Sequence, residues 1–163
     1  DCLGVGRNMA KSIRHWLEVC GLAERPSRKE PYRLTPLAET IEMYDPFMLD
    51  PVTWWALHCN MAIRDQHGAT WTWFFGIFSS DRFDRVTCVD QLARYTALQE
   101  RRAPSRETLN RDVLCLLSTY ARAVPPTNED PEEWRDSPFR ELGLLTHYIE
   151  TDTYQINRGS KPE

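Results

Sequence analysis

The chain has 163 residues, of which 41% are apolar and 27% charged, as is ordinary for a globular protein. Seven Gly and eleven Pro favour helices with sharp boundaries and argue against a β-sandwich. The net charge of −4 excludes a polycation, but residues 1–35 hold seven Lys and Arg against four Asp and Glu, and the remainder holds thirteen against twenty. This asymmetry predicts an anion-facing region on an acidic body.

The cysteines indicate the cellular compartment, and the length of the apolar runs indicates whether the chain could cross a membrane. Five dispersed cysteines form no C-x-x-C pair, which argues against a disulfide framework and a zinc finger and indicates a reducing, cytoplasmic setting. The most apolar run, residues 71–78, is far too short to cross a membrane, so we expect no membrane partner. Because the chain opens with Asp1 rather than Met, we interpret it as a segment of a longer protein.

Residues 1–44 predict a truncated winged-helix unit. Within them, residues 7–20 suit a helix, because apolar residues recur along one face. Gly21 is the residue type that most often ends a helix. The expected buried stripe of this helix is Met9, Ile13, Trp16, Leu17 and Cys20.

A hairpin is predicted after this helix. Extended runs at 22–23 and 32–35 flank a basic, Pro-containing loop, as in the wing of a winged helix. Thr35 and Pro36 then suit the cap and first position of a helix that we expect to end near residue 44.

Residues 45–86 predict an aromatic-rich helical connector. Asp50 is expected to cap a helix over 51–65 that is apolar nearly all round and therefore central and buried. Thr70 is expected to cap a short aromatic helix over 71–78. We interpret the dense aromatic residues of this segment as core rather than as a platform for single-stranded bases.

Residues 87–163 repeat the pattern as a second winged-helix-like unit. Thr87 is expected to cap a helix over 88–100, and Ser105 a helix over 106–122 with one apolar stripe. The remaining predicted elements are an acidic, Pro-rich loop at 124–138, a helical turn at 139–142 and a hairpin of 145–150 with 153–157. The predicted fold is mainly α with short β-hairpins, as tandem winged helix-turn-helix-like units around a central helical core.

A cationic ridge on the first helix is the sharpest functional signal. At 100° per residue, Arg7, Lys11 and Arg14 project within about 60° of one another. Such a ridge suits a recognition helix, where Lys and Arg contact phosphates and Arg and Asn read bases. Glu18 on the same face favours the alternative of a solvated surface. Asn8 and His15 flank the ridge and join it as candidate DNA contacts.

Further candidate DNA contacts lie on the wing and in the second unit. The wing follows the ridge directly and carries basic residues where it would meet the adjacent backbone. The second unit has arginines in its turn, but its long helix mixes both charges, so a structural or dimerising role is equally open. These candidates are Arg25, Arg28, Lys29 and Arg33 on the wing, and Arg101, Arg102, Arg106 and Arg111 in the second unit.

Catalysis has only weak candidates, Asp45, Asp50 and His58. A metal-dependent nuclease needs carboxylates that converge on a cation such as Mg²⁺. Both aspartates precede Pro, however, and also suit turn or cap positions, and His58 can hydrogen-bond within its own helix. No Gly-rich phosphate loop, G-x-S-x-G or H-E-x-x-H motif occurs. From the residues alone we expect no metal or other cofactor in this segment.

An ordered series of blocks resembles a known family. The blocks are GVGRNMAKSIRHW, YRLTPLAE, DPFMLDPVTWWALHCN, TWTWFF and TLNRDVLCLLSTY, and they span nearly the whole chain. They resemble the SspB-type proteins of bacterial DNA phosphorothioation (Ssp) systems, a domain-of-unknown-function family found beside phosphoadenosine-phosphosulfate-reductase-like proteins. The resemblance implies an anti-phage defence role and a DNA nickase, with a divalent metal such as Mg²⁺ where nicking occurs. Implied partners are double-stranded DNA, a cysteine desulfurase, an ATPase and an ATP pyrophosphatase.

Three functions stay open at this point. The first is a DNA-binding component that introduces or supports single-strand nicks for sulfur incorporation. The second is a winged-helix domain that assembles the proteins of a modification complex. The third is a transcriptional regulator without enzymatic activity.

Overall fold

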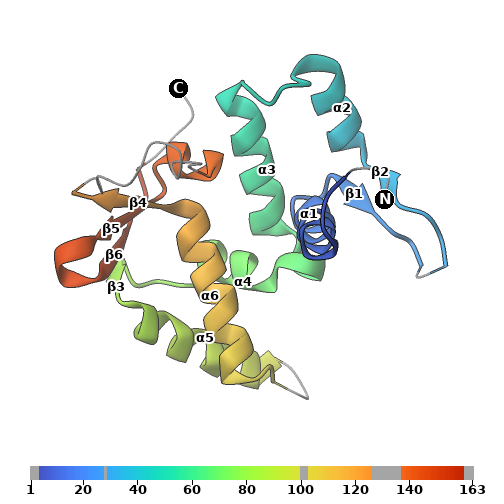
Figure 1. The fold of residues 1–163 in the computed structure, drawn as a ribbon. Helices are drawn as coiled ribbons and strands as arrows, with labels where there is room; N and C mark the ends of the chain where they lie inside the picture. The colour runs from blue at the N-terminus through green and yellow to red at the C-terminus, as the bar shows by residue number, and fades with distance from the viewer. Residues whose placement is uncertain (1–3, 28, 100–102, 126–136, 160–163) are drawn as a thin grey trace. The chain divides into compact units, whose positions relative to one another are not determined.

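A computed structural model describes residues 4–27, 29–99, 103–125 and 137–159. The chain divides into two compact units, and Figure 1 labels their helices and strands. The first unit is residues 1–72 and the second is residues 73–163. The division into three segments that the sequence suggested remains a prediction.

The first unit is helical with one small hairpin. The hairpin strands pair antiparallel, Ala23 with Leu34 and Glu24 with Arg33, as the sequence predicted. The elements are α1 (Arg7–Val19), β1 (Ala23–Glu24), β2 (Arg33–Leu34), α2 (Pro36–Tyr44), α3 (Pro51–Ile63) and α4 (Asp65–Gly76), which crosses into the second unit.

Side-chain caps set the starts of α2 and α3, as predicted. The Thr35 hydroxyl accepts a hydrogen bond from the Ala38 amide at 3.3 Å and donates one to the Gly21 carbonyl at 2.7 Å. The Asp50 carboxylate accepts from the Val52 amide at 2.9 Å. Each cap satisfies an amide that the first helical turn would otherwise leave unpaired.

Gly21 ends α1, as its sequence position indicated. Its φ is +68°, the left-handed region that glycine adopts most readily. A Cβ at this position would lie 2.0 Å from Asn60 Nδ2, which donates to the Cys20 carbonyl at 2.7 Å. The turn thus depends on glycine twice, once for its backbone and once for the close approach of α3.

Two expectations about burial in the first unit are wrong. The stripe of α1 is only partly covered, with Met9 59% exposed and Ile13 and Leu17 also exposed. The predicted central helix, α3, is not buried all round, because Ile63 is 78% exposed and Val52 is exposed too. Its buried side chains are Thr53, Leu57, His58 and Met61.

The second unit combines two long helices with a small sheet. Its elements are β3 (Arg82–Phe83), α5 (Arg85–Gln99), α6 (Arg106–Tyr120), β4 (Ala121–Val124), the 3₁₀ helices η1 (Pro138–Leu142) and η2 (Ile149–Thr151), β5 (Leu145–Tyr148) and β6 (Thr153–Ile156). The sheet order is β3-β6-β5-β4, in which only β4 and β5 run parallel. The β5–β6 hairpin was predicted, whereas β3 and β4 were not.

The core of the second unit follows the predicted apolar stripe of α6. Leu109, Val113, Leu116, Leu117 and Tyr120 are each at most 3% exposed. Five rings of the aromatic segment are buried, which confirms their interpretation as core. These are Trp71 in the first unit and Trp73, Phe74, Phe78 and Phe83 in the second.

Two helix starts differ from the prediction. Helix α4 begins at Asp65, so Thr70 lies inside it rather than at its cap. Helix α5 begins at Arg85, because the Asp84 carboxylate accepts from the Thr87 amide at 2.7 Å and Asp84 takes the capping role expected of Thr87. Aspartate and threonine are both common N-cap residues. Because Asp84 lies before Thr87 in the chain, α5 is longer by most of a turn than predicted.

The fold class, mainly α with short β-hairpins, is confirmed. The arrangement as tandem winged helices stays a prediction. Among the described residues, no helix is long and apolar enough to cross a membrane.

Candidate nucleic-acid interface

The α1 ridge, Arg7, Lys11 and Arg14, is exposed to solvent along its whole length. Within the described part of the chain none of the three forms an ion pair, so their charge is not neutralised by a neighbouring carboxylate. The flanking Asn8 and His15 are exposed as well. Arg7 and Asn8 lie in the first turn of α1, where a recognition helix usually meets base edges.

Tyr32 joins the ridge to the hairpin. The Arg14 guanidinium carbon lies 5.7 Å from the centroid of the Tyr32 ring, and that of Arg25 lies 5.5 Å from it. The Tyr32 hydroxyl donates to Glu18 Oε1, and this hydrogen bond is the largest cause that raises the pKa of Tyr32. In the sequence, Glu18 favoured the alternative that this face of α1 is only a solvated surface. In the structure, Glu18 links α1 to the hairpin through this hydrogen bond.

The hairpin lies beside α1 (Figure 1), and it carries basic residues. Lys29 is exposed, and Arg33 is exposed while it pairs with Glu30 at 3.1 Å. Arg25 Nε donates to the Glu30 carbonyl at 2.7 Å, which ties the two sides of the loop together. Arg28 lies outside the described residues.

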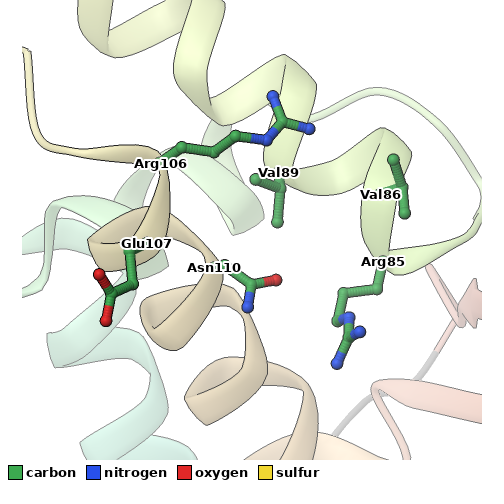
Figure 2. A pocket seen from close by; sticks show the side chains of 6 residues that line it. All are labelled: Arg85, Val86, Val89, Arg106, Glu107 and Asn110. Carbon is green, nitrogen blue, oxygen red and sulfur yellow. The ribbon is translucent and has the colours of Figure 1, made fainter.

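In the second unit, a hollow of about 390 Å³ lies between α5 and α6 (Figure 2). Arg85, Val86 and Val89 line it from α5. Arg106, Glu107 and Asn110 line it from α6, and the Asn110 amide is turned toward α5 (Figure 2). The guanidiniums of Arg85 and Arg106 and the Asn110 amide are groups that can bind a phosphate, whereas the Glu107 carboxylate would repel one.

The charges of this hollow are unequal. Arg106 pairs with Asp90 at 2.6 Å, which offsets part of its charge. Arg85 makes no ion pair with any described residue, so it is the stronger anion ligand of the two. Arg111 is exposed on α6, whereas Arg101 and Arg102 fall outside the described residues.

The candidate catalytic aspartates have structural roles. The Asp45 carboxylate accepts hydrogen bonds from the Leu49 amide at 2.9 Å, the Asp50 amide at 3.1 Å and the Thr53 hydroxyl at 2.6 Å. The Thr53 hydrogen bond is the main cause that lowers the pKa of Asp45. Asp50 caps α3. Both aspartates therefore hold the turn between α2 and α3, the alternative role that their sequence context allowed.

His58 is buried in α3, and burial lowers its pKa to about 4. Among the described residues, no three His, Cys, Asp or Glu side chains gather as a group that could hold a metal ion. A divalent metal bound by three or more protein carboxylates does not fit what the described residues offer, and we derive no chemistry through one.

Sequence reasoning overlooked Tyr32 and Arg85. Tyr32 is the only aromatic residue in a run that holds Arg25, Arg28, Lys29 and Arg33, and an aromatic ring among cations is a recognisable sign of cation–π contact. Arg85 follows Asp84 directly, so finding the true cap of α5 would have placed it in the first turn.

The fold and the exposed surface define a mainly helical protein with a cationic helix beside a basic hairpin. The chain belongs to the family described as "Protein of unknown function (DUF4007)", whose sequence model matches residues 1–163. Comparison with curated proteins gives no match.

Two solved structures share this fold. One is described as "SspB crystal structure", at 22% identity and a TM-score of 0.78, and the other as "Magnesium ion-bound SspB crystal structure", at 24% identity and a TM-score of 0.82. In each case 98% of this chain aligns with 50% of the other. The chain therefore spans about half the length of the proteins that it resembles.

Proposed function

We propose that this chain is a DNA-binding module of a bacterial DNA phosphorothioation system, and that it contacts duplex DNA through α1 and the β1–β2 hairpin. The observation that carries the proposal is the α1 ridge, because three exposed cations lie on one helix face and none of them pairs with a carboxylate of a described residue. The fold that it shares with SspB supports the assignment to such a system.

The proposed contacts follow from the chemistry of each side chain. Lys11 and Arg14 neutralise phosphates, while Arg7 and Asn8, in the first turn, reach base edges of guanine or adenine. The hairpin cations Lys29 and Arg33 meet the adjacent backbone. Tyr32 keeps Arg14 and the hairpin in one arrangement, so fewer side chains lose freedom on binding.

The module supports the single-strand nicks at which sulfur would be incorporated, and we assign the nicking chemistry to no residue of this segment. The magnesium ion of the magnesium-bound SspB structure belongs to that protein. A cysteine desulfurase, an ATPase and an ATP pyrophosphatase are the proposed protein partners. The proposal expects no relaxed circles when the segment alone is incubated with supercoiled plasmid and Mg²⁺, and relaxed circles would contradict it.

The binding test compares two double variants in fluorescence anisotropy with a labelled duplex. Arg7→Ala/Lys11→Ala removes two ridge charges that form no ion pair with a described residue, and it spares Arg14, which contacts Tyr32. Arg94→Ala/Arg122→Ala removes two exposed charges of the second unit as a matched control. We expect the ridge variant to bind about tenfold more weakly or worse, and the control to change by less than about threefold. Equal losses would refute the assignment to α1.

Protein assembly is the second candidate function, and a specific surface favours it. Five large apolar side chains at the end of α2, at the start of α3 and in the turn between them are exposed within ten residues of sequence, and such clusters often mark interaction sites. They are Met43, Tyr44, Phe47, Leu49 and Val52. If assembly is the function, Phe47→Ser/Leu49→Ser abolishes co-purification with the desulfurase or the ATPase and leaves duplex binding intact. Undiminished co-purification would reject this second function.

A further inference from the structure

Four paired residues form one row across the sheet of the second unit. Ala123 of β4 pairs with His147 of β5, His147 pairs with Tyr154 of β6, and Tyr154 pairs with Phe83 of β3. Directly paired residues project from the same face of a sheet. The row therefore runs from one edge strand to the other on a single face.

Three members of the row are stacked rings. The His147 and Tyr154 rings are 4.2 Å apart between centroids and 5° from parallel, and Tyr154 and Phe83 are 5.8 Å apart at 21°. Because Tyr154 covers one face of the His147 ring, the opposite face is turned toward the neighbouring strand, where Ala123 stands. An alanine methyl is too small to cover an imidazole ring. The row of stacked rings therefore ends at His147, because its neighbour on the edge strand β4 is Ala123.

A hollow of about 370 Å³ is lined by Ala123, His147 and Tyr154 of this row. Ala121 and Ala123 line it from the edge strand, Leu117 from α6 and Ile149 from η2. Small-molecule sites usually have volumes of about 300–1,000 Å³ and a mostly apolar lining with a few placed polar groups. This hollow, which we call the ring slot, falls within that range of volume, and its lining combines apolar side chains with the polar groups of Ser118, Arg140 and His147.

The polar groups of the ring slot are held in place. His147 Nε2 and Asp152 Oδ1 are 3.0 Å apart, which fixes the imidazole plane. Arg140, which also lines the slot, donates from Nε and a terminal nitrogen to the Ser118 carbonyl at 3.1 and 2.9 Å. The slot therefore offers a flat stacking surface, a nearby cation and little mobile structure to order on binding.

We propose that the ring slot binds an unpaired nucleobase, which stacks on His147 and completes the row. Flat heteroaromatic rings are the ligands that an exposed ring face recognises, and stacking accepts any base. The inference deepens the proposed function, since a DNA-binding module would present such bases to the slot. The base can come from a single strand or from a free nucleotide, which the experiment below separates.

The experiment follows the His147 ring protons by NMR while the whole chain is titrated with dAMP, with deoxyribose 5-phosphate, with single-stranded dA12 and with a blunt duplex. The His147→Phe spectrum identifies the His147 signals. We expect dAMP and dA12 to move them upfield through the ring current of the stacked adenine, and deoxyribose 5-phosphate and duplex to leave them unchanged. A shift with dAMP but not dA12 assigns the slot to free nucleotides.

Two variants make the test decisive. Ala123→Phe fills the slot from within and is expected to weaken dAMP binding by about tenfold or more, whereas His147→Phe keeps a ring and is expected to retain it. Binding by every variant is followed through the H2 and H8 signals of dAMP, because the His147 variants lack the imidazole protons. If Ala123→Phe does not fold, His147→Ala takes its place with the same expected loss. No His147 shift with either base-containing probe, or an equal shift with deoxyribose 5-phosphate, would overturn the proposal. Duplex affinity, measured on the same samples, reports separately on the α1 ridge.

Discussion

Single residues of this chain show how burial and hydrogen bonds change a side chain's chemistry. His58 was a weak candidate for catalysis, but burial lowers its pKa to about 4, well below the ordinary value of about 6.5. The imidazole is therefore neutral in the folded protein at physiological pH. The buried position of His58 in α3 indicates a role in the stability of the first unit.

A pH dependence of stability follows from this shift. Between about pH 6.5 and pH 4 the unfolded chain binds a proton at residue 58 that the folded chain does not, so the free energy of unfolding falls as pH drops through this window. The loss is up to about 3 kcal/mol by pH 4. Urea titrations at half-unit pH steps check this, and His58→Gln should remove that part of the slope. Parallel curves for the two proteins would contradict the prediction.

Gly21 gives a second prediction at the residue scale. Gly21→Ala places a Cβ in the left-handed region and 2.0 Å from Asn60 Nδ2, so we expect a loss of more than about 1 kcal/mol in the free energy of unfolding. Gly6→Ala is the control, because φ there is −63° and no atom lies within 4 Å of the new Cβ. Urea unfolding measures both, and equal effects would mean that the α1–α3 contact does not constrain residue 21.

At the scale of helices and strands, helix caps could be predicted from the sequence, whereas the pairing of strands that lie far apart in the chain could not. The caps at Thr35, Asp50 and Ser105 were predicted, because a cap involves neighbours only two or three residues away. Strands β3 and β4 were missed, since each is short and is defined by partners far along the chain. The stripe of α1 was correctly recognised as apolar. Hydrophobic periodicity does not show, however, whether an apolar helix face packs against another element.

The cap of α6 gives a prediction at this scale. Ser105 Oγ accepts from the Thr108 amide at 3.2 Å, so Ser105→Ala should lower the free energy of unfolding by about 1 kcal/mol. Ser118→Ala on the same helix is the control, because its hydroxyl only donates to the Cys115 carbonyl within the helix and we expect a change within about 0.5 kcal/mol. Thermal unfolding followed by circular dichroism compares the two. A Ser118→Ala loss equal to that of Ser105→Ala would argue against the cap.

For the whole molecule, the distribution of charge matters more than its sum. The net charge of −4 gives no hint of polyanion binding, whereas the α1 ridge and the hairpin gather cations in one unit. The sequence could identify this ridge because one helix face depends on spacing alone. It could not identify the hollow between α5 and α6 or the ring slot, which depend on how distant elements pack within the second unit.

The salt dependence of duplex binding tests the central claim most directly. Each phosphate contact contributes about 0.9 to the slope of log K against log salt concentration on B-DNA. Because Lys11 is assigned to a phosphate and Arg7 to a base edge, the slope of Arg7→Ala/Lys11→Ala should be shallower than the original by about 1. A change of about 2 would mean that Arg7 also contacts a phosphate. Identical slopes for the original chain and this variant would contradict the account, because the ridge would then release no counterions.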